Sequence, residues 1–278
     1  MRAGPLSNPR VISLLNGYFI PVYATNEDYK DGGEASPEEK NEYGRIFQEA
    51  RQGGLSVGTV HVYILKPDGH PIASLHVVQA SNTSKLVELL QSTVAQLNTH
   101  EGPTLVQPAA QSRPPEAAPD SLVLHLVSRG FNRGIWREFP AENWLVLSRE
   151  EWMKLWDRAE VKAGSSWDID PDVAGKLLTY FYPQTENNDV TSNRFERQSL
   201  KATVLSNEGG VARARLDGSL RMKHTFYPNK EDGNYAEATV VGFMDFDPAN
   251  PRVIKFRMAT YRAIYAGEMF SVAVRSVP

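Results

Sequence analysis

The stretch VARARLDGSLRMKHTF, residues 211–226, decides the fold of the C-terminal half of the chain. The even-numbered positions of this stretch, which are one parity of the predicted strand, carry the core-forming side chains. They are Ala212, Ala214, Leu216, Leu220, Met222, His224 and Phe226. Alternation with a period of two is typical of a β-strand that buries one face. The same alternation returns in residues 236–246, 254–258 and 270–274. These segments predict an antiparallel β-meander with one buried face.

Two helix patterns precede the meander, so we expect an α+β domain. Residues 147–156, LSREEWMKLW, contain a capping box from Ser148 to Glu151 and would bury both tryptophans of the segment. Residues 170–181 begin with Asp170 as the helix cap and Pro171 at the first helical position.

The opposite parity of the predicted sheet is rich in basic residues. They are Arg213, Arg215, Arg221, Lys223, Lys255, Arg257 and Arg275, interrupted by Glu237 and Asp245. A sheet face lined with arginine can bind phosphates or an acidic partner. The alternative is a solvated outer face with cross-strand ion pairs. We therefore treat this basic stripe as a candidate binding surface, with Arg213, Arg215, Arg221, Lys223 and Arg257 as its candidate residues.

A second candidate is SRGFNRGIWREFPAENW, residues 128–144, which we expect to form a loop. It combines arginines with tryptophans, and both are enriched in binding hot spots. Its glycines would allow close approach to a ligand. Arg133, Trp136 and Arg137 are the candidate binding residues here. The alternative is a loop whose aromatic side chains cover the end of the sheet.

Composition excludes several classes of function. The 278 residues include no cysteine, which excludes thiol nucleophiles, dithiol redox chemistry and cysteine-ligated metals. A net charge of -3 gives no reason to expect nucleic acid as a partner. No phosphate-binding loop, dinucleotide fingerprint or nucleophile elbow is present, so we expect no cofactor.

No apolar run reaches the roughly 18 residues of a membrane span. The N-terminus lacks a signal peptide's apolar core, which makes a cytoplasmic location the default expectation. A mature or truncated fragment would look the same and would be extracytoplasmic.

The clearest boundary is residues 101–120, EGPTLVQPAAQSRPPEAAPD. Its prolines and alanines predict a semi-extended linker. We therefore expect an N-terminal domain over residues 1–100 and a C-terminal domain over residues 121–278.

Helix and strand signals alternate in the N-terminal half. We expect a helix after Asn8 and Pro9, a strand over 18–25, a helix over 42–52, strands over 59–65 and 71–78, and a helix from about residue 84. The stretches NPRVISLLNGYFIPVYATNED, VGTVHVYILKPDG and SKLVELLQSTVAQL carry this order. Over residues 7–98 it resembles the thioredoxin-like family, and the resemblance implies an α/β fold.

The departures from that family concern its redox site. Its Cys-x-x-Cys motif, its first strand and its cis-proline are absent, and Val60 stands at the proline position. A cis bond before valine costs about 3–4 kcal/mol, so we expect a trans bond there. The chain is therefore predicted not to be a thiol–disulfide oxidoreductase.

The missing first strand would be central in a thioredoxin-like sheet. Residues 122–127 are apolar on both parities, as in a strand covered on two faces. Our hypothesis is that this segment fills the N-terminal sheet or seals an interface between the domains. The alternative is that upstream sequence was lost when Met1 was assigned as the start.

Histidines offer two further sites. His61 and His76 lie on neighbouring predicted strands, where two imidazoles could ligate a metal, although no third ligand has diagnostic spacing. His224 falls on the buried parity, where it could act as a base. For all three, the alternative is a hydrogen-bonded structural histidine.

The favoured function is a non-catalytic binding or assembly protein. The resemblance implies this, because members of the family that lack the dithiol commonly serve as interaction domains. Its partner would be a protein or a small anionic ligand. The alternative is an enzyme or a carrier of a small anionic ligand with its site on the C-terminal sheet.

Overall fold

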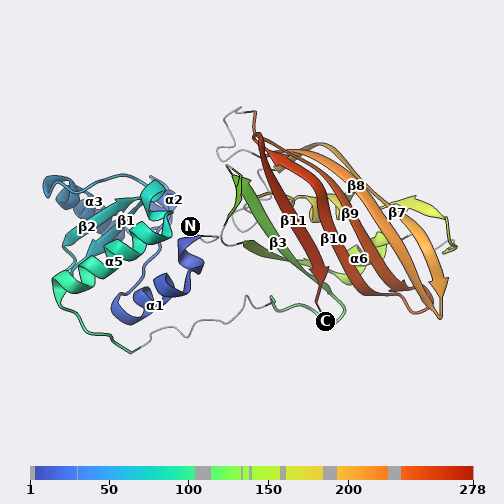
Figure 1. Cartoon of the computed structure of the whole chain (residues 1–278), viewed down its shortest axis with the longest axis horizontal. Coiled ribbons are helices and arrows are strands. Elements are labelled where there is room, and N and C mark those ends of the chain that lie inside the picture. Colours follow the sequence, from blue (N-terminus) through green and yellow to red (C-terminus); the bar gives the residue numbers. More distant parts are fainter. Residues whose placement is uncertain are drawn as a thin grey trace. The chain divides into compact units, whose positions relative to one another are not determined.

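The computed structural model describes residues 4–29, 31–103, 114–132, 134–137, 140–156, 161–183, 193–224 and 233–277. The chain divides into two compact units, Met1–Ala110 and Gln111–Pro278 (Figure 1). The division falls within residues 101–120.

The N-terminal unit packs helices around a two-stranded antiparallel sheet. Its elements are η1 (Pro5–Ser7), α1 (Pro9–Tyr18), α2 (Asn26–Tyr29), α3 (Pro37–Gln52), β1 (His61–Leu65), β2 (Pro71–His76), α4 (Val77–Ala80) and α5 (Thr83–Leu97). The two strands pair from His61 opposite His76 to Leu65 opposite Pro71. A small core joins α1, β1 and α5 through Val11, Ile64 and Leu90.

The predicted start of α1 is confirmed, and that of α5 is within one residue. Helix α3 begins at Pro37, five residues before the expected start, because Ser36 and Glu39 form a capping box there. The Asn8 side chain accepts hydrogen bonds from the N–H groups of Arg10 and Val11, and Pro9 opens α1. Helix α5 begins at Thr83, one residue before the expected start, because Asn82 supplies its cap. The peptide bond before Val60 is trans, as expected.

The predicted strand over residues 18–25 is wrong. Helix α1 runs to Tyr18, and Phe19 is extended, but residues 19–25 belong to no strand. The apolar, β-branched composition of the segment is typical of a strand. A strand also needs a hydrogen-bonded neighbour, and no described strand pairs with this segment.

The C-terminal unit is built on a nine-stranded sheet. Its elements are β3 (Leu122–Asn132), β4 (Ile135–Trp136), β5 (Ala141–Leu147), α6 (Arg149–Trp152), η2 (Met153–Leu155), β6 (Ser166–Asp168), α7 (Pro171–Leu178), β7 (Asn193–Glu208), β8 (Val211–His224), β9 (Tyr235–Asp247), β10 (Arg252–Tyr265) and β11 (Glu268–Ser276). The strand order is β4-β3-β11-β10-β9-β8-β7-β6, and β5 also pairs with β3. Every pairing is antiparallel. The predicted large antiparallel sheet is thus confirmed.

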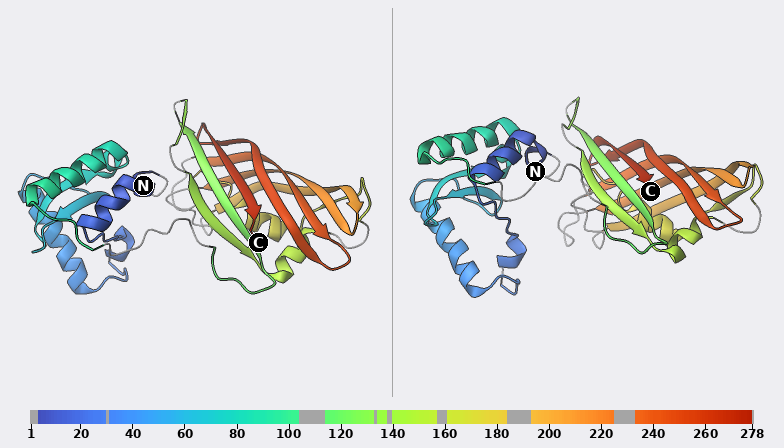
Figure 2. Two further views of the ribbon diagram at one scale, coloured as in Figure 1. Left: turned by 60° about the horizontal axis from the view of Figure 1, so that its bottom comes forward. Right: turned by 90° about the horizontal axis from the view of Figure 1, so that it is seen from below.

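The helical segments of this unit pack against one face of the sheet (Figure 2). The core contains the predicted parity of β8 and β9 together with side chains from α6, η2 and α7. Trp156 stacks on Phe246 with ring centroids 5.0 Å apart, and Trp167 meets the same ring edge-on at 6.4 Å. The capping box from Ser148 to Glu151 is present, as predicted.

The parity prediction fails at two described positions, because Lys223, expected on the outer face, is only 5% exposed, and Ile254 departs as well. Ile254 was expected in the core and is 44% exposed, because the pairing of β10 with β9 shifts register between Val253 and Lys255. A β-bulge of this kind reverses the faces of the residues on either side of it.

Two glycines let the strands of this sheet approach closely. A Cβ on Gly218 would lie 2.5 Å from the carbonyl oxygen of Ser199, and a Cβ on Gly242 would lie 2.5 Å from that of Arg257. Both distances are too short for any side chain, so these positions require glycine. Glycine inside a strand commonly marks a tight bend or such a close approach.

Two expectations about the start of this unit are corrected. Residues 122–127 belong to β3, which pairs with β11 and β5, so they do not fill the N-terminal sheet. Residues 128–144 are largely strand: β3 continues to Asn132, and β4 and β5 follow as its neighbours. Asn132 of β3 stands opposite Ile135 of β4, where a loop was predicted.

Within the described part of the chain, no helix combines the length and the apolar character needed to cross a membrane.

Candidate functional site

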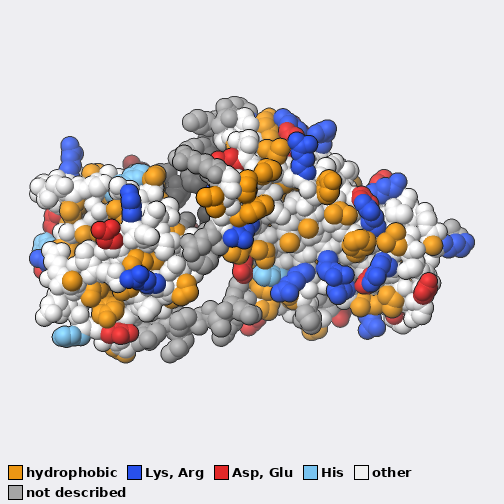
Figure 3. Space-filling view, in the orientation of Figure 1, with side chains coloured by type: hydrophobic (Ala, Val, Ile, Leu, Met, Phe, Trp, Pro, Cys, Tyr) orange, Lys and Arg blue, Asp and Glu red, His pale blue; other side chains and the backbone are white. Residues whose placement is uncertain are grey.

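The outer face of the C-terminal sheet carries the predicted basic stripe. Figure 3 shows basic side chains gathered across this face, with hydrophobic side chains between them. Most of the candidate residues have acidic partners. Arg213 donates two hydrogen bonds to Asp245, at 2.7 and 2.9 Å, and Arg215 pairs with Asp217 at 2.8 Å. Arg221 pairs with Glu196 at 2.6 Å and also with Glu237.

These pairs change the titration of the groups involved. Hydrogen bonding to Arg213 holds the pKa of Asp245 below its ordinary value, and hydrogen bonding to Asp245 raises the pKa of Arg213. Hydrogen bonding to Arg221 lowers the pKa of Glu196 in the same way. Arg213 and Arg221 are therefore engaged in cross-strand ion pairs, which was the alternative interpretation of the stripe.

Lys223 is also a poor binding candidate. Its side chain is buried, only 5% exposed, and its Nζ lies 5.5 Å from the centre of the Tyr235 ring. The guanidinium of Arg221 lies over the same ring at 4.1 Å. Tyr235 thus packs against both basic side chains.

Two arginines remain without such partners. Arg257 on β10 and Arg275 on β11 are exposed and stand directly opposite each other. Among the described residues, neither makes a hydrogen bond or an ion pair, although Arg257 contributes a minor through-space effect on Asp245. Like charges directly opposite each other destabilise a sheet. This uncompensated pair is therefore the feature of the outer face that most needs a functional explanation.

The strand register places aromatic side chains on both sides of this pair. Phe243 on β9 stands opposite Arg257, while His125 on β3 stands opposite Arg275 and also opposite Trp144 on β5. Phe243, Arg257, Arg275, His125 and Trp144 therefore form one line across five adjacent strands, which we call the cross-sheet row. At about 4.8 Å between strands, the row is about 19 Å long.

The His125 end of the row is held in place by stacking. The His125 and Trp144 rings are 4.4 Å apart at an interplanar angle of 24°, and His125 Nε2 lies 3.2 Å from Glu142 Oε2. Phe243 at the other end is 39% exposed. The row thus combines two guanidinium groups that have no ion-pair partner in the described part of the chain with flanking aromatic surface, which suits an acidic partner.

The sequence analysis missed Phe243, His125 and Trp144 as parts of this surface. Their parity shows that they face outward with the basic residues. Only the pairing of β3 with β11 and β5 brings His125 and Trp144 to Arg275. That pairing joins segments from opposite ends of the C-terminal half, so no local sequence pattern predicts it.

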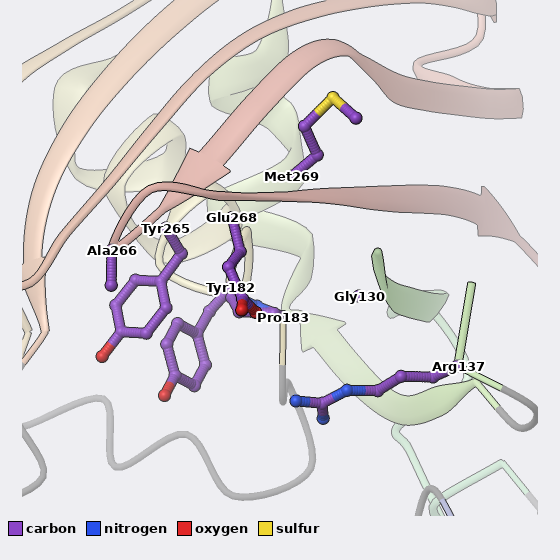
Figure 4. A pocket seen from close by; sticks show the side chains of 8 residues that line it. All are labelled: Gly130, Arg137, Tyr182, Pro183, Tyr265, Ala266, Glu268 and Met269. Carbon is purple, nitrogen blue, oxygen red and sulfur yellow. The ribbon is translucent and has the colours of Figure 1, made fainter. Parts of the chain in front are cut away.

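A pocket of about 250 Å³ lies near the β10–β11 turn. It is lined by Gly130, Arg137, Tyr182, Pro183, Tyr265, Ala266, Glu268 and Met269. Figure 4 shows the side chain of Arg137 extending toward Tyr182, with Tyr265 beside it. The two tyrosine rings meet edge-on at 4.9 Å. Arg137, one of the candidate binding residues from residues 128–144, thus lines a concave site.

The other two candidates from the hairpin do not join Arg137. Trp136 packs edge-on against Phe131 at 5.0 Å and does not line the pocket. Arg133 lies outside the described residues.

The two histidines of the N-terminal sheet do come together. His61 stands opposite His76, and their rings are 5.0 Å apart and edge-on. His61 Nε2 lies 2.9 Å from Ser56 Oγ, and His76 Nδ1 accepts a hydrogen bond from the N–H of Val78. Burial lowers the pKa of His61, and the nearby His76 lowers it further. In the described part of the chain, no group of three metal-ligating side chains forms.

Asp247 is a turn residue: its carboxylate accepts hydrogen bonds from the N–H groups of Ala249 and Asn250, each at 2.9 Å. The side chain of His224 lies outside the described part of the chain, so its predicted role as a base stays a prediction.

Comparison of the chain with protein-family models, with curated proteins and with solved structures gave no match.

Proposed function

We propose that this chain is a non-catalytic binding protein whose C-terminal sheet binds an acidic protein partner at the cross-sheet row. The main observation behind this proposal concerns Arg257 and Arg275. Both side chains are exposed, they stand opposite each other, and neither has an acidic partner among the described residues. A carboxylate-rich partner would neutralise both guanidinium groups at once.

The surroundings of the pair support a protein partner. The row presents aromatic surface at both ends, and aromatic and arginine side chains are the usual anchors of protein interfaces. A standard interface buries roughly 800 Å² on each partner, a patch about 28 Å wide. The row spans five strands, and the sheet continues beyond it through β8 and β7.

The N-terminal unit belongs to the same proposal as a redox-inactive thioredoxin-like domain. Its support is the α1, β1–β2, α5 arrangement, the trans bond before Val60 and a chain without cysteine. A scaffold of this kind without a thiol cannot carry out dithiol exchange, so binding is the role left to it under this proposal.

The proposal is tested by reversing the charge of the pair. Arg257→Glu with Arg275→Glu should weaken binding of labelled poly-glutamate by roughly tenfold or more, and should reduce its dependence on salt. Fluorescence anisotropy measured at several salt concentrations reports both quantities.

The matched control is Arg51→Glu with Lys85→Glu, which makes the same change in net charge at exposed positions of the N-terminal unit. Equal loss of binding in the two double variants would show that only net charge matters and would refute the proposal. A further variant, Trp144→Ala, should weaken binding without changing its salt dependence.

A second candidate function rests on the pocket, where Arg137 lies beside two tyrosine rings. An arginine in a concave, partly aromatic site suits a small carboxylate. A panel of small carboxylates should then raise the melting temperature of the wild type and not that of Arg137→Gln. No shift with any member of the panel would refute this candidate.

A further inference from the structure

Residues 20–24 form an apolar segment that belongs to no helix or strand, and no described strand pairs with it. Ile20, Val22 and Tyr23 are 80%, 80% and 88% exposed. Among the described residues, no backbone group from residue 20 to residue 24 takes part in a hydrogen bond. Exposed β-branched and aromatic side chains on extended backbone are the usual content of a strand.

The same unit contains an open sheet edge. Among the described strands, β1 pairs with β2 alone. The N–H of Val77 donates to the carbonyl of Val60, and the N–H of Lys66 donates to that of His70, so the even-numbered residues of β1 face β2. The backbone groups of His61 and Tyr63 consequently point to the other edge, where no described strand pairs with them. A sheet of only two strands is marginally stable, and an open edge accepts a further strand.

The segment is suited to that edge. N–H and C=O groups of alternate residues point to the same side of a strand, so Ile20, Val22 and Ala24 can all bond on one side. Pro21 lacks an N–H, but the backbone groups of odd-numbered residues point to the opposite edge of the segment, away from the even-numbered pairing edge. Pairing through the even-numbered residues therefore loses no hydrogen bond to the proline. The proline also blocks addition of another strand, which limits growth of the assembly.

We infer that Phe19–Thr25 of one copy of this chain adds as an edge strand to β1 of a second copy, and that the exchange is reciprocal. The argument for a second copy is that each chain carries both halves of the contact and does not join them within itself. Two such contacts related by a twofold axis satisfy both open edges and both free segments. The product is a closed dimer.

The first test is the mass of the full-length chain by native mass spectrometry across a range of concentrations. We expect a dimer for the wild type and a monomer for Val22→Lys, because the charge prevents burial against β1. The control is Val78→Lys, which puts the same charge at another exposed valine of this unit, 73% exposed, and should stay dimeric. Circular dichroism confirms that each variant is folded.

The second test uses the absence of cysteine. Val22→Cys and Tyr63→Cys are made as separate single-cysteine chains, mixed and oxidised; paired strands bring Cα atoms within the roughly 4.4–6.8 Å of a disulfide. The exchange is supported if the yield of the disulfide-linked dimer that contains one chain of each variant exceeds the yield of the dimers that contain two chains of the same variant. His61→Cys in place of Tyr63→Cys checks the register.

Three results would overturn the inference. A monomeric wild type at every concentration excludes the dimer, and a dimer that survives Val22→Lys uses another surface. A chain carrying both Val22→Cys and Tyr63→Cys that closes its disulfide within one molecule shows that the segment pairs with its own β1. The contact does not involve the cross-sheet row, so each of these results leaves the proposed acidic partner untouched.

Discussion

At the scale of single residues, the ion pair between Arg213 and Asp245 makes stability depend on pH. The folded-state pKa of Asp245 is lowered, so its contribution is present above the unfolded pKa of about 3.9 and is lost as the pH falls through the folded-state value. Asp245→Asn should lower stability at neutral pH and flatten the loss of stability in acid. Urea unfolding measured from neutral pH to about pH 3 checks this.

The control for that measurement is Asp217→Asn. Its carboxylate pairs with Arg215 on the same strand and is 51% exposed, whereas that of Asp245 is 13% exposed. We expect a smaller change, because exposed ion pairs contribute little. Identical acid profiles for the wild type and Asp245→Asn would contradict the prediction.

Parity predicted the outward direction of most basic residues of the candidate surface, although Lys223 is buried. The period of two in residues 211–226 assigned Arg213, Arg215 and Arg221 to the outer face, and the structure agrees. Parity carries no information about which residues stand opposite one another. The acidic partner of Arg213 and the juxtaposition of Arg257 with Arg275 both depend on register, which bulges and turns determine.

At the scale of elements, the β10–β11 hairpin contains a strained turn residue. Ala266 has φ +49° and Gly267 has φ +83°, which suits a two-residue turn with both central residues in the left-handed region. Alanine disfavours that region, and asparagine tolerates it. Ala266→Asn should stabilise the protein by about 0.5–1 kcal/mol. The melting temperature in thermal unfolding measures the gain in stability. The control is Ala263→Asn, which should destabilise the protein because Ala263 is buried in β10.

The errors at this scale have a common cause. Residues 18–25 were predicted to be a strand on composition, and residues 128–144 were predicted to be a loop on their glycines and mixed polarity. Strand formation depends on the neighbour as well as on the segment. β3 and its partners supply neighbours to the second segment, and none of the described strands pairs with the first. The starts of α1 and α5 were predicted better because their capping residues are local in sequence. The start of α3 was missed although Ser36 and Glu39 form an equally local capping box.

At the scale of the whole molecule, the close approach of strands in the C-terminal sheet depends on positions that exclude a Cβ. Gly242→Ala should destabilise the protein by about 1–3 kcal/mol, because the new methyl would meet the carbonyl oxygen of Arg257. The matched control is Gly44→Ala in α3, where nothing lies within 4 Å of the new Cβ. That change should be stabilising by up to about 1 kcal/mol. Urea unfolding distinguishes the two; equal effects would refute the role assigned to Gly242.

The placement of the aromatic residues gives each unit a different optical signal. All five tryptophans belong to residues 121–278, and three of them, Trp152, Trp156 and Trp167, contact the buried core around Phe246. Fluorescence excited selectively in tryptophan therefore reports on the C-terminal unit alone, while far-ultraviolet circular dichroism reports on both units. The difference between the two melting curves isolates the N-terminal unit without any added label.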